Sequence, residues 1–240
     1  MGLSIHYDFE YHQDYPTKII NTLRHKALTL PFENVSELGH LVGSECDYVK
    51  VSRENEWLWL LIQATETIED KEKREYSYCV TPIEVIAFRT WPGEGCEPAN
   101  FGLCRFPSKI EIDNDRSIET GLGTGWHWSS FFKTQYVMQS GIEHFLKCHL
   151  MVIKMLDFAK ELGILKRVSD DGEYWKKRSV EELVKEVGEW DAFIAAQVGS
   201  LLDKTPEGGH VEAEILKRPD FEHLETEGRK LYPQLFKKEN

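Results

Sequence analysis

Residues 121–136 hold the side chains of this chain that are best suited to chemistry, where a glycine-rich turn runs into a β-like segment. The segment carries His127, an imidazole of the kind used in acid–base catalysis, and Lys133, a cation that can hold negative charge. In a regular strand these two residues lie about 20 Å apart, at roughly 3.3 Å per residue, so they cannot act on one atom unless a bulge or bend intervenes. Lys133 and Gln135 are two positions apart and can contact one anionic or amide-bearing ligand.

A structural interpretation of the same segment competes with the chemical one. If the strand is regular, its even-numbered residues, including Trp128, share one face, and its odd-numbered residues, including His127, share the other. His127 is then a half-buried, hydrogen-bonded side chain between aromatic neighbours. The sequence leaves open whether Trp128 faces the core or a ligand, and Trp128 is kept as a candidate ligand contact.

The turn at Cys96 and Glu97 places a thiol on a glycine-flanked loop. Such a thiol can act as a nucleophile if His6 or His127 folds against it. The carboxylate of Glu97 raises the pKa of a neighbouring thiol, which argues against activation and favours an ordinary turn cysteine. Glu97 itself is a candidate ligand contact.

A second polar turn, Asp170-Asp-Gly-Glu173, precedes Tyr174 and Trp175. Its carboxylates can bind a cation or supply a general base, and Asp171 or Glu173 can position a catalytic histidine. The same residues suit a turn ahead of a helix, because carboxylates stabilise the positive end of the helix dipole. Both interpretations stay open from the sequence.

Metal and cofactor motifs are weak. His144 and Cys148 are four positions apart, so on a helix both can reach one zinc ion, but no other His, Cys or Asp has a spacing that marks it as a further ligand. His149 follows an apolar stripe and is predicted to be a core histidine. Gly121-Leu-Gly-Thr-Gly125 lacks the glycine spacing of a dinucleotide loop and the lysine of a P-loop. We therefore predict no metal site and assign no cofactor.

The elements that must position these residues follow from hydrophobic periodicity. Strands are predicted over residues 3–9, 82–91, 101–106, 126–136 and 164–168. Helices are predicted over residues 16–29, over residues 142–163, and after Ser179, which forms a capping box with Glu182. Residues 57–62 are apolar on both faces and predict a buried strand or a buried helix turn, residues 68–75 predict a charged loop, and prolines limit regular structure after residue 205.

The order of these elements, strands first and helices later, favours an α+β fold. We predict one domain over residues 1–240, strand-rich over 1–136 and helix-rich over 137–240. Its core is a mixed or antiparallel sheet of about five strands, flanked by two or three helices.

Composition disfavours several classes of partner. The chain has 41 acidic and 29 basic residues in 240, a net charge of −12, and an acidic surface repels nucleic-acid phosphates and anionic lipid. No window of about 18 apolar residues predicts a bilayer-spanning helix, and no signal peptide is recognisable. The five cysteines are scattered without a CxxC pair, as expected for reduced thiols in a cytoplasm. We expect no nucleic-acid partner, no membrane partner and a cytoplasmic location.

Four short islands carry a resemblance to a known family. They are the opening Met-Gly-Leu-Ser-Ile-His-Tyr, Gly95-Cys-Glu-Pro98, Phe132-Lys-Thr-Gln-Tyr136 and Asp170-Asp-Gly-Glu-Tyr-Trp175. In this order they resemble a family of uncharacterised bacterial proteins that open on MGLxIHY and carry later KTQ and D-E-G-x-Y-W segments. The resemblance implies a bacterial, cytoplasmic protein that is one unit, without an assigned activity. Members of the family often follow Tyr-Trp with Glu, where this chain has Lys176.

The islands suggest a shared site at one end of the sheet, because ligand sites form where loops gather over a rigid scaffold. Their polar residues are His6, Glu97, Lys133, Gln135, Asp171 and Glu173. The first hypothesis is an enzyme or small-molecule binder in which His6 or His127 is the acid–base group and Lys133 holds negative charge. The alternative is a non-catalytic regulatory or interaction protein, a homodimer in which the tryptophans are core and interface residues.

Overall fold

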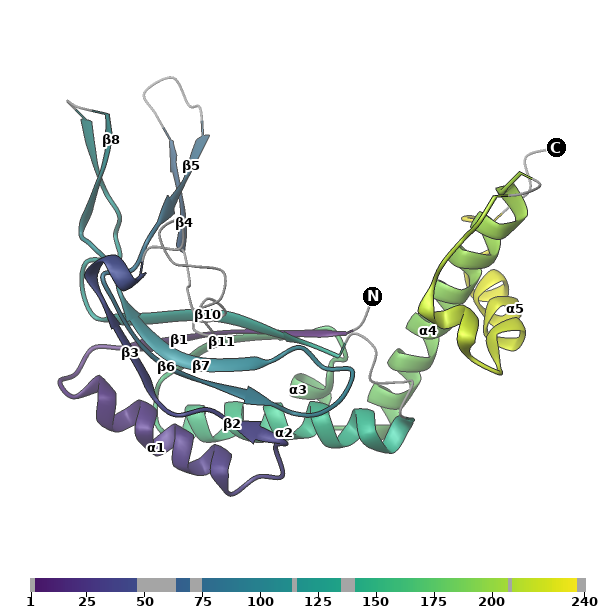
Figure 1. Ribbon diagram of the computed structural model, residues 1–240, viewed down its shortest axis with the longest axis horizontal. Helices are drawn as coiled ribbons and strands as arrows, with labels where there is room; N and C mark the ends of the chain where they lie inside the picture. The colour runs from purple at the N-terminus through teal and green to yellow at the C-terminus, as the bar shows by residue number, and fades with distance from the viewer. Residues whose placement is uncertain are drawn as a thin grey trace.

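The centre of the protein is one antiparallel sheet. The computed structural model describes residues 3–46, 64–69, 75–113, 116–134, 141–206 and 209–236. Its seven-stranded sheet has the order β11-β1-β10-β7-β6-β2, and β3 also pairs with β6 (Figure 1). The strands are β1 (Ser4–Tyr11), β2 (Asn34–Val35), β3 (Gly39–Val42), β6 (Glu84–Trp91), β7 (Ala99–Arg105), β10 (Trp126–Lys133) and β11 (Leu165–Asp170). The chain thus has the predicted α+β fold, with a larger sheet than expected because β2 and β3 are too short to show periodicity.

Two separate hairpins stand above the sheet (Figure 1). They are formed by β4 (Ala64–Glu69) with β5 (Glu75–Val80), and by β8 (Lys109–Asp113) with β9 (Arg116–Glu119). The loop predicted over residues 68–75 is therefore wrong at both ends, because residues 68 and 69 belong to β4 and Glu75 begins β5. The apolar run at 57–62 lies outside the described residues.

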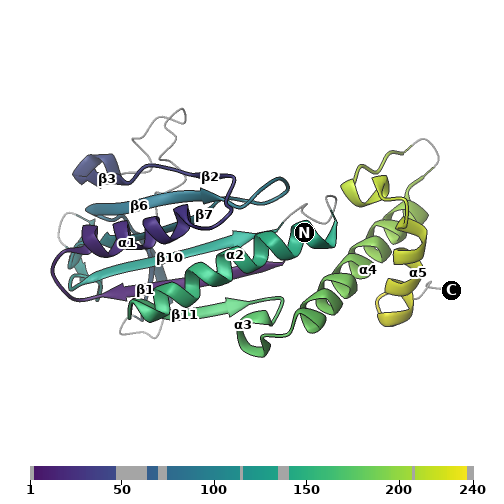
Figure 2. The same cartoon turned by 90° about the horizontal axis from the view of Figure 1, so that it is seen from below.

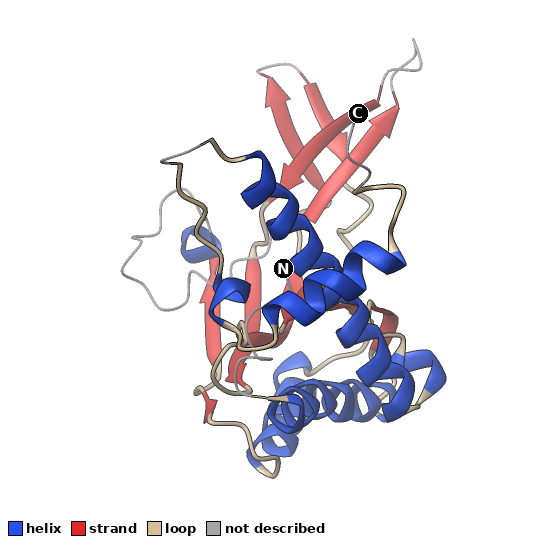
Figure 3. Ribbon diagram, turned by 90° about the vertical axis from the view of Figure 1, so that its right-hand side faces the viewer, coloured by secondary structure: helices blue, strands red, loops and turns tan. Residues whose placement is uncertain are grey.

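Helices α1 (Pro16–Leu28) and α2 (Ile142–Glu161) cover one face of the sheet, opposite the hairpins (Figures 2 and 3). Pro16 opens α1, where its missing N–H costs nothing, and Gly163 follows α2 with a φ of 73°. Each helix buries an apolar stripe against the strands, as its 3.6-residue period predicts. Gly141 is the N-cap residue of α2 and has a φ of 89°.

Side chains along β1 alternate between the buried face of the sheet and the opposite face, and this alternation determines which of them a ligand can reach. Ile5, Tyr7 and Phe9 are buried under the helices, while His6 is exposed and Asp8 is half-buried on the opposite face. This opposite face of β1, β10 and β11 is called the open face below. In the pairing of β1 with β10, Ser4 lies opposite Lys133, and His6 lies opposite Phe131. These four residues therefore lie together on the open face.

The C-terminal helices extend beyond the sheet (Figure 1). After the short α3 (Tyr174–Lys177), α4 (Val180–Lys204) starts at the predicted capping box, where Ser179 Oγ accepts a hydrogen bond of 3.1 Å from the Glu182 N–H. The first turns of α4 join the core, and its later turns pack against α5 (Phe221–Leu231). The helix α5 was not predicted, because two prolines flank it. None of the helices in the described part of the chain is long and apolar enough to cross a bilayer.

Candidate functional site

The four islands of the sequence adjoin at one end of the sheet. Ser4 pairs with Lys133 in the β1–β10 register, and the Asp171 N–H donates to the Ser4 carbonyl over 3.0 Å. The Glu97 N–H donates to the Lys133 carbonyl over 2.9 Å. Backbone hydrogen bonds therefore join the turn after β11, the start of β1, the end of β10 and the loop before β7.

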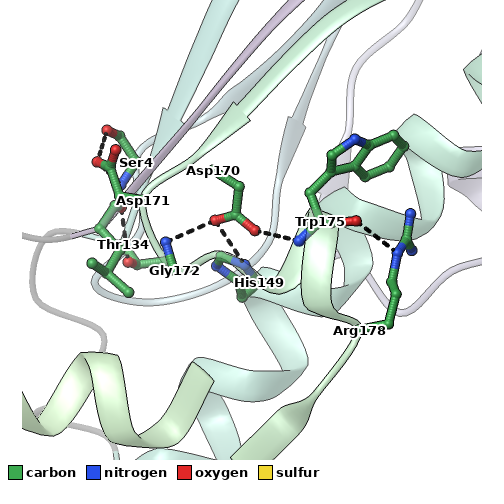
Figure 4. Close-up of polar contacts among 9 residues, drawn as sticks. Ser4, Thr134, His149, Asp170, Asp171, Gly172, Trp175 and Arg178 are labelled. Carbon is green, nitrogen blue, oxygen red and sulfur yellow. Dashed lines mark hydrogen bonds and ion pairs between the residues drawn. The ribbon is translucent and has the colours of Figure 1, made fainter. Parts of the chain in front are cut away.

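A chain of side-chain contacts runs across this junction from Asp171 through Ser4 to His6. The Ser4 N–H and hydroxyl both donate to Asp171 Oδ2, the former over 3.0 Å (Figure 4). Ser4 Oγ also lies 3.2 Å from His6 Nε2. A serine hydroxyl has one proton, and an ionised carboxylate only accepts, so that proton lies toward Asp171. Ser4 Oγ must then accept from a protonated Nε2 of His6.

This arrangement selects one tautomer of the neutral imidazole. With the proton on Nε2, the Nδ1 atom of His6 carries a lone pair. His6 is exposed, and among the described residues none hydrogen-bonds its Nδ1. The atom is therefore free to take a proton from, or accept a hydrogen bond from, a bound molecule.

An aromatic ring and a cation lie beside this imidazole on the open face. The Phe131 ring lies 5.7 Å from the His6 ring, between centroids, and the Phe131 residue is 45% exposed. The Lys133 ammonium lies 5.2 Å from the Phe131 ring centroid. We name these three residues, His6, Phe131 and Lys133, the His6 surface.

Lys133 differs from the other cations of the open face. Arg167 is 2.6 Å from Asp8, and Lys166 is 2.9 Å from Glu10, so both are neutralised by carboxylates. Within the described ranges Lys133 has no carboxylate within ion-pair distance. Its charge is available to an anion from solution.

The turn that carries Asp171 is fixed by its buried neighbour Asp170. The Asp170 carboxylate accepts hydrogen bonds from the Gly172 N–H, at 3.0 Å, and the Trp175 N–H, at 2.8 Å, and lies 3.5 Å from His149 Nε2 (Figure 4). Burial alone would raise the pKa of Asp170, but the His149 contact and the two backbone hydrogen bonds outweigh it and hold the pKa below its usual value. His149 is a core histidine, as predicted, with its side chain fully buried.

Glu173 pairs with a lysine of the following helix. It adopts a left-handed conformation, with φ of 56°, just before α3, and its carboxylate contacts Lys176 at 3.2 Å. Asp171, of the two carboxylates considered for positioning a histidine, is the one that connects to His6.

His127 occupies a separate place on the open face. Its Nε2 donates to the Thr124 carbonyl over 3.0 Å, its Nδ1 is 3.9 Å from Glu10, and its side chain is 16% exposed. It lies four positions before Phe131 on β10, about 13 Å along the strand. His127 and His6 therefore do not share one site.

Three further candidates have different positions. Trp128 is 2% exposed and donates its indole N–H to the Asn100 carbonyl over 3.2 Å, so it packs in the core, away from the open face. Glu97 meets the junction through its backbone N–H, and Gln135 lies outside the described residues. Within the described part of the chain, no group of three or more His, Cys, Asp or Glu side chains has the arrangement of a metal site.

Comparisons with protein-family models, with curated proteins and with solved structures found no match to this chain. No activity or site residue therefore transfers from a relative, and the geometry alone carries the functional argument. Ser4, which links Asp171 to His6, was not among the site residues predicted from the sequence. Its position two residues before His6, on the same face of a predicted strand, is the signal that could have identified it.

Proposed function

We propose that the protein binds a small anion with a planar or aromatic part at the His6 surface, and that His6 Nδ1 exchanges a proton with this ligand. The observation that carries the proposal is the contact chain from Asp171 through Ser4 to His6. It orients an exposed imidazole and leaves one ring nitrogen for a ligand. Ser4 and Asp171 act as positioning residues, because they reach the ligand only through His6.

The class of ligand follows from the neighbours of His6. Lys133 supplies a positive charge that no described carboxylate neutralises, and this favours an anionic group. Phe131 presents an exposed ring, against which a planar group stacks favourably. An aromatic carboxylate combines both features in one small molecule and is the probe we choose.

An enzymatic role extends the same proposal. A general base must lie within hydrogen-bond reach of the proton that it takes, and its orientation must be held before the ligand arrives. The Asp171–Ser4 pair supports that role by fixing the His6 ring. We further place the protein in the cytoplasm, on the evidence of its scattered cysteines.

Titration of the full chain with benzoate tests this function. We expect benzoate to shift the NMR resonances of His6 and Phe131, and Lys133→Gln to weaken its binding about fivefold, because one exposed charge pair contributes up to about 1 kcal/mol. The matched control is Lys166→Gln, which removes a cation of the same face that Glu10 already neutralises. We expect it to leave the affinity unchanged.

Two results would contradict the proposal. One is a benzoate response confined to resonances far from the His6 surface. The other is an equal loss of affinity in Lys133→Gln and Lys166→Gln, which would show that only the overall charge of the protein matters.

Self-association is the second candidate function, and one observation favours it. Several large apolar side chains are exposed on α4, on α5 and in the segment that follows α5. They are Trp190 (41% exposed), Leu201 (55%), Leu202 (41%), Leu231 (48%) and Leu235 (57%). Large apolar side chains left in water are typical of surfaces that meet another protein. A homodimer through this region would cover them.

A further inference from the structure

The strand β11 pairs with β1 on the side opposite β10, so His6 has a neighbouring strand on each side (Figure 2). In the antiparallel pairing of β1 with β11, His6 lies opposite Ser169, and Asp8 lies opposite Arg167. The pairing is regular over these residues, because its one register shift comes after Asp8. Ser169 and Arg167 therefore lie on the open face beside His6.

Lys133 and Arg167 occupy the two ends of a diagonal across the open face, with His6 at its midpoint. Lys133 lies one strand away from His6 on β10, opposite Ser4, which comes two residues before His6. Arg167 lies one strand away on β11, opposite Asp8, which comes two residues after His6. At about 4.8 Å per strand and about 3.3 Å per residue, the Cα atoms of the two cations are about 16 Å apart. Their long side chains can therefore reach the two ends of one molecule that lies over His6.

Arg167 keeps most of its hydrogen-bond donors open to a ligand. Its Nε donates to Asp8 Oδ2 over 2.6 Å, and no other described residue hydrogen-bonds its guanidinium. The Arg167 side chain is 74% exposed, so the four N–H donors of Nη1 and Nη2 face water. Because the pair with Asp8 is neutral overall, these donors favour a neutral acceptor, such as a carbonyl oxygen, over a second anion.

A second arginine of this protein shows that one guanidinium can hold two acceptors at once. Arg218 donates from Nε and Nη2 to Asp220, and from Nη1 to Asp191. Among the described residues Arg167 has one such partner, Asp8. A ligand can supply the second acceptor without breaking that pair.

The two side chains that flank His6 differ in size. Phe131, on the β10 side, presents a large ring, whereas Ser169, on the β11 side, is small and exposed. A planar ligand that stacks on Phe131 therefore has room to extend past Ser169 toward Arg167. This extension leads away from Lys133, so the ligand groups that meet the two cations lie at opposite ends of the ligand.

We propose that Arg167 is a specificity-determining contact for the ligand of the His6 surface, and that this ligand carries a carbonyl group at the end opposite its anionic group. The anionic group at Lys133 and the planar part at Phe131 are taken from the proposed function, on which this inference rests. The ligand class narrows to an aromatic carboxylate with a neutral carbonyl group across the ring. Para-carbamoylbenzoate has both groups in these positions and is the probe we choose.

Titration of the full chain with substituted benzoates tests this inference. Para-carbamoylbenzoate carries the carbonyl acceptor, and para-isopropylbenzoate has nearly the same shape and the same charge without it. We expect the carbamoyl compound to bind about fivefold more tightly, because one hydrogen bond contributes a net factor of about this size. Equal charge means that overall attraction to the protein cannot produce the difference.

A pair of conservative variants gives the second arm. Arg167→Lys keeps a positive charge beside Asp8 but removes the Nη donors. We expect the preference for the carbamoyl compound to fall about fivefold, while the affinity for unsubstituted benzoate stays the same. The matched control is Lys166→Arg, at the neighbouring position of β11, where the cation pairs with Glu10. It should keep the wild-type preference.

The outcomes distinguish a failure of this inference from a failure of the proposed function. If benzoate shifts the His6 resonances but wild type and Arg167→Lys have the same preference between the two compounds, Arg167 does not contact the ligand. The proposed function then stands without it. If benzoate leaves the resonances of His6 and Phe131 unchanged, the proposed function fails, and the contact with Arg167 fails with it.

Discussion

Replacement of Asp170 by asparagine is expected to lower the free energy of unfolding by about 3 kcal/mol at neutral pH. The carboxylate accepts two backbone hydrogen bonds and lies beside His149, with both side chains buried. An amide of the same shape turns an N–H₂ group toward at least one of these donors, and removal of one partner from a buried charged network costs about 3–5 kcal/mol. Urea unfolding of the two proteins at pH 7 measures the difference.

The difference in unfolding free energy between wild type and Asp170→Asn is expected to depend on pH. The pKa of Asp170 lies below its ordinary value of 3.8 in the folded protein, so the folded state binds the proton less tightly than the unfolded state. The stabilisation by the carboxylate is therefore fully present above about pH 4 and is lost as the pH falls through the lower folded pKa. We expect the difference between wild type and Asp170→Asn to shrink on acidification below pH 4, since protonation of Asp170 removes what the substitution removes.

Asp157→Asn is the control for this prediction. Asp157 pairs with Arg178 through two contacts of 2.8 Å near the same turn, but both side chains are 40% exposed. An exposed pair contributes up to about 1 kcal/mol, so the control should remain close to wild type. Equal destabilisation by the two substitutions would show that the buried network around Asp170 contributes no more to stability than the exposed pair of Asp157 and Arg178.

Gly228→Ala is expected to separate α5 from α4. A Cβ at residue 228 would overlap the backbone carbonyl of Ala192 and lie 2.8 Å from the Ala196 side chain, so neither neighbour can move aside without moving α4. Overpacking of this kind costs about 1–3 kcal/mol and, at a helix crossing, forces the two backbones apart. We expect the amide protons of α5 to exchange with solvent much faster, while those of the central sheet keep their protection.

Gly188→Ala is the matched control, in the same helix α4. A Cβ there meets no atom within 4 Å, and alanine in a helix is more favourable than glycine by about 0.5–1 kcal/mol. The control should therefore be slightly more stable than wild type. Light scattering on both variants also bears on the second candidate function, because a dimer formed through α4 and α5 should dissociate in Gly228→Ala and persist in Gly188→Ala.

Local patterns in the sequence were sufficient for most of the central fold. The strict alternation of Ile5, Tyr7 and Phe9 defined β1 and its buried face, and Ser179 with Glu182 marked the start of α4. These elements were predictable because a strand or helix with one buried face repeats its apolar residues at a fixed period. The short strands β2 and β3 and the helix α5 carry no such repeat of sufficient length.

The site could be predicted only in part, because its contacts join distant segments. His6, Lys133 and Asp171 were all candidates from their residue types, but Ser4 and Asp171 are 167 positions apart and meet only in the folded sheet. The separation of His6 from His127 likewise depends on the register of β1 with β10. The hydrogen bond between His144 and the Glu94 carbonyl requires the β6–β7 loop to fold onto α2, which no local pattern predicts.

The protonation pattern of the His6 ring tests the central claim most directly. Nitrogen-15 NMR distinguishes which ring nitrogen of a neutral histidine carries the proton. The contact chain from Asp171 through Ser4 predicts the proton on Nε2 in the wild type, a mixture of both tautomers in Ser4→Ala, and a shift of the Nδ1 resonance when benzoate binds. A proton on Nδ1 in the wild type, or a ring that benzoate leaves unchanged, would contradict the account.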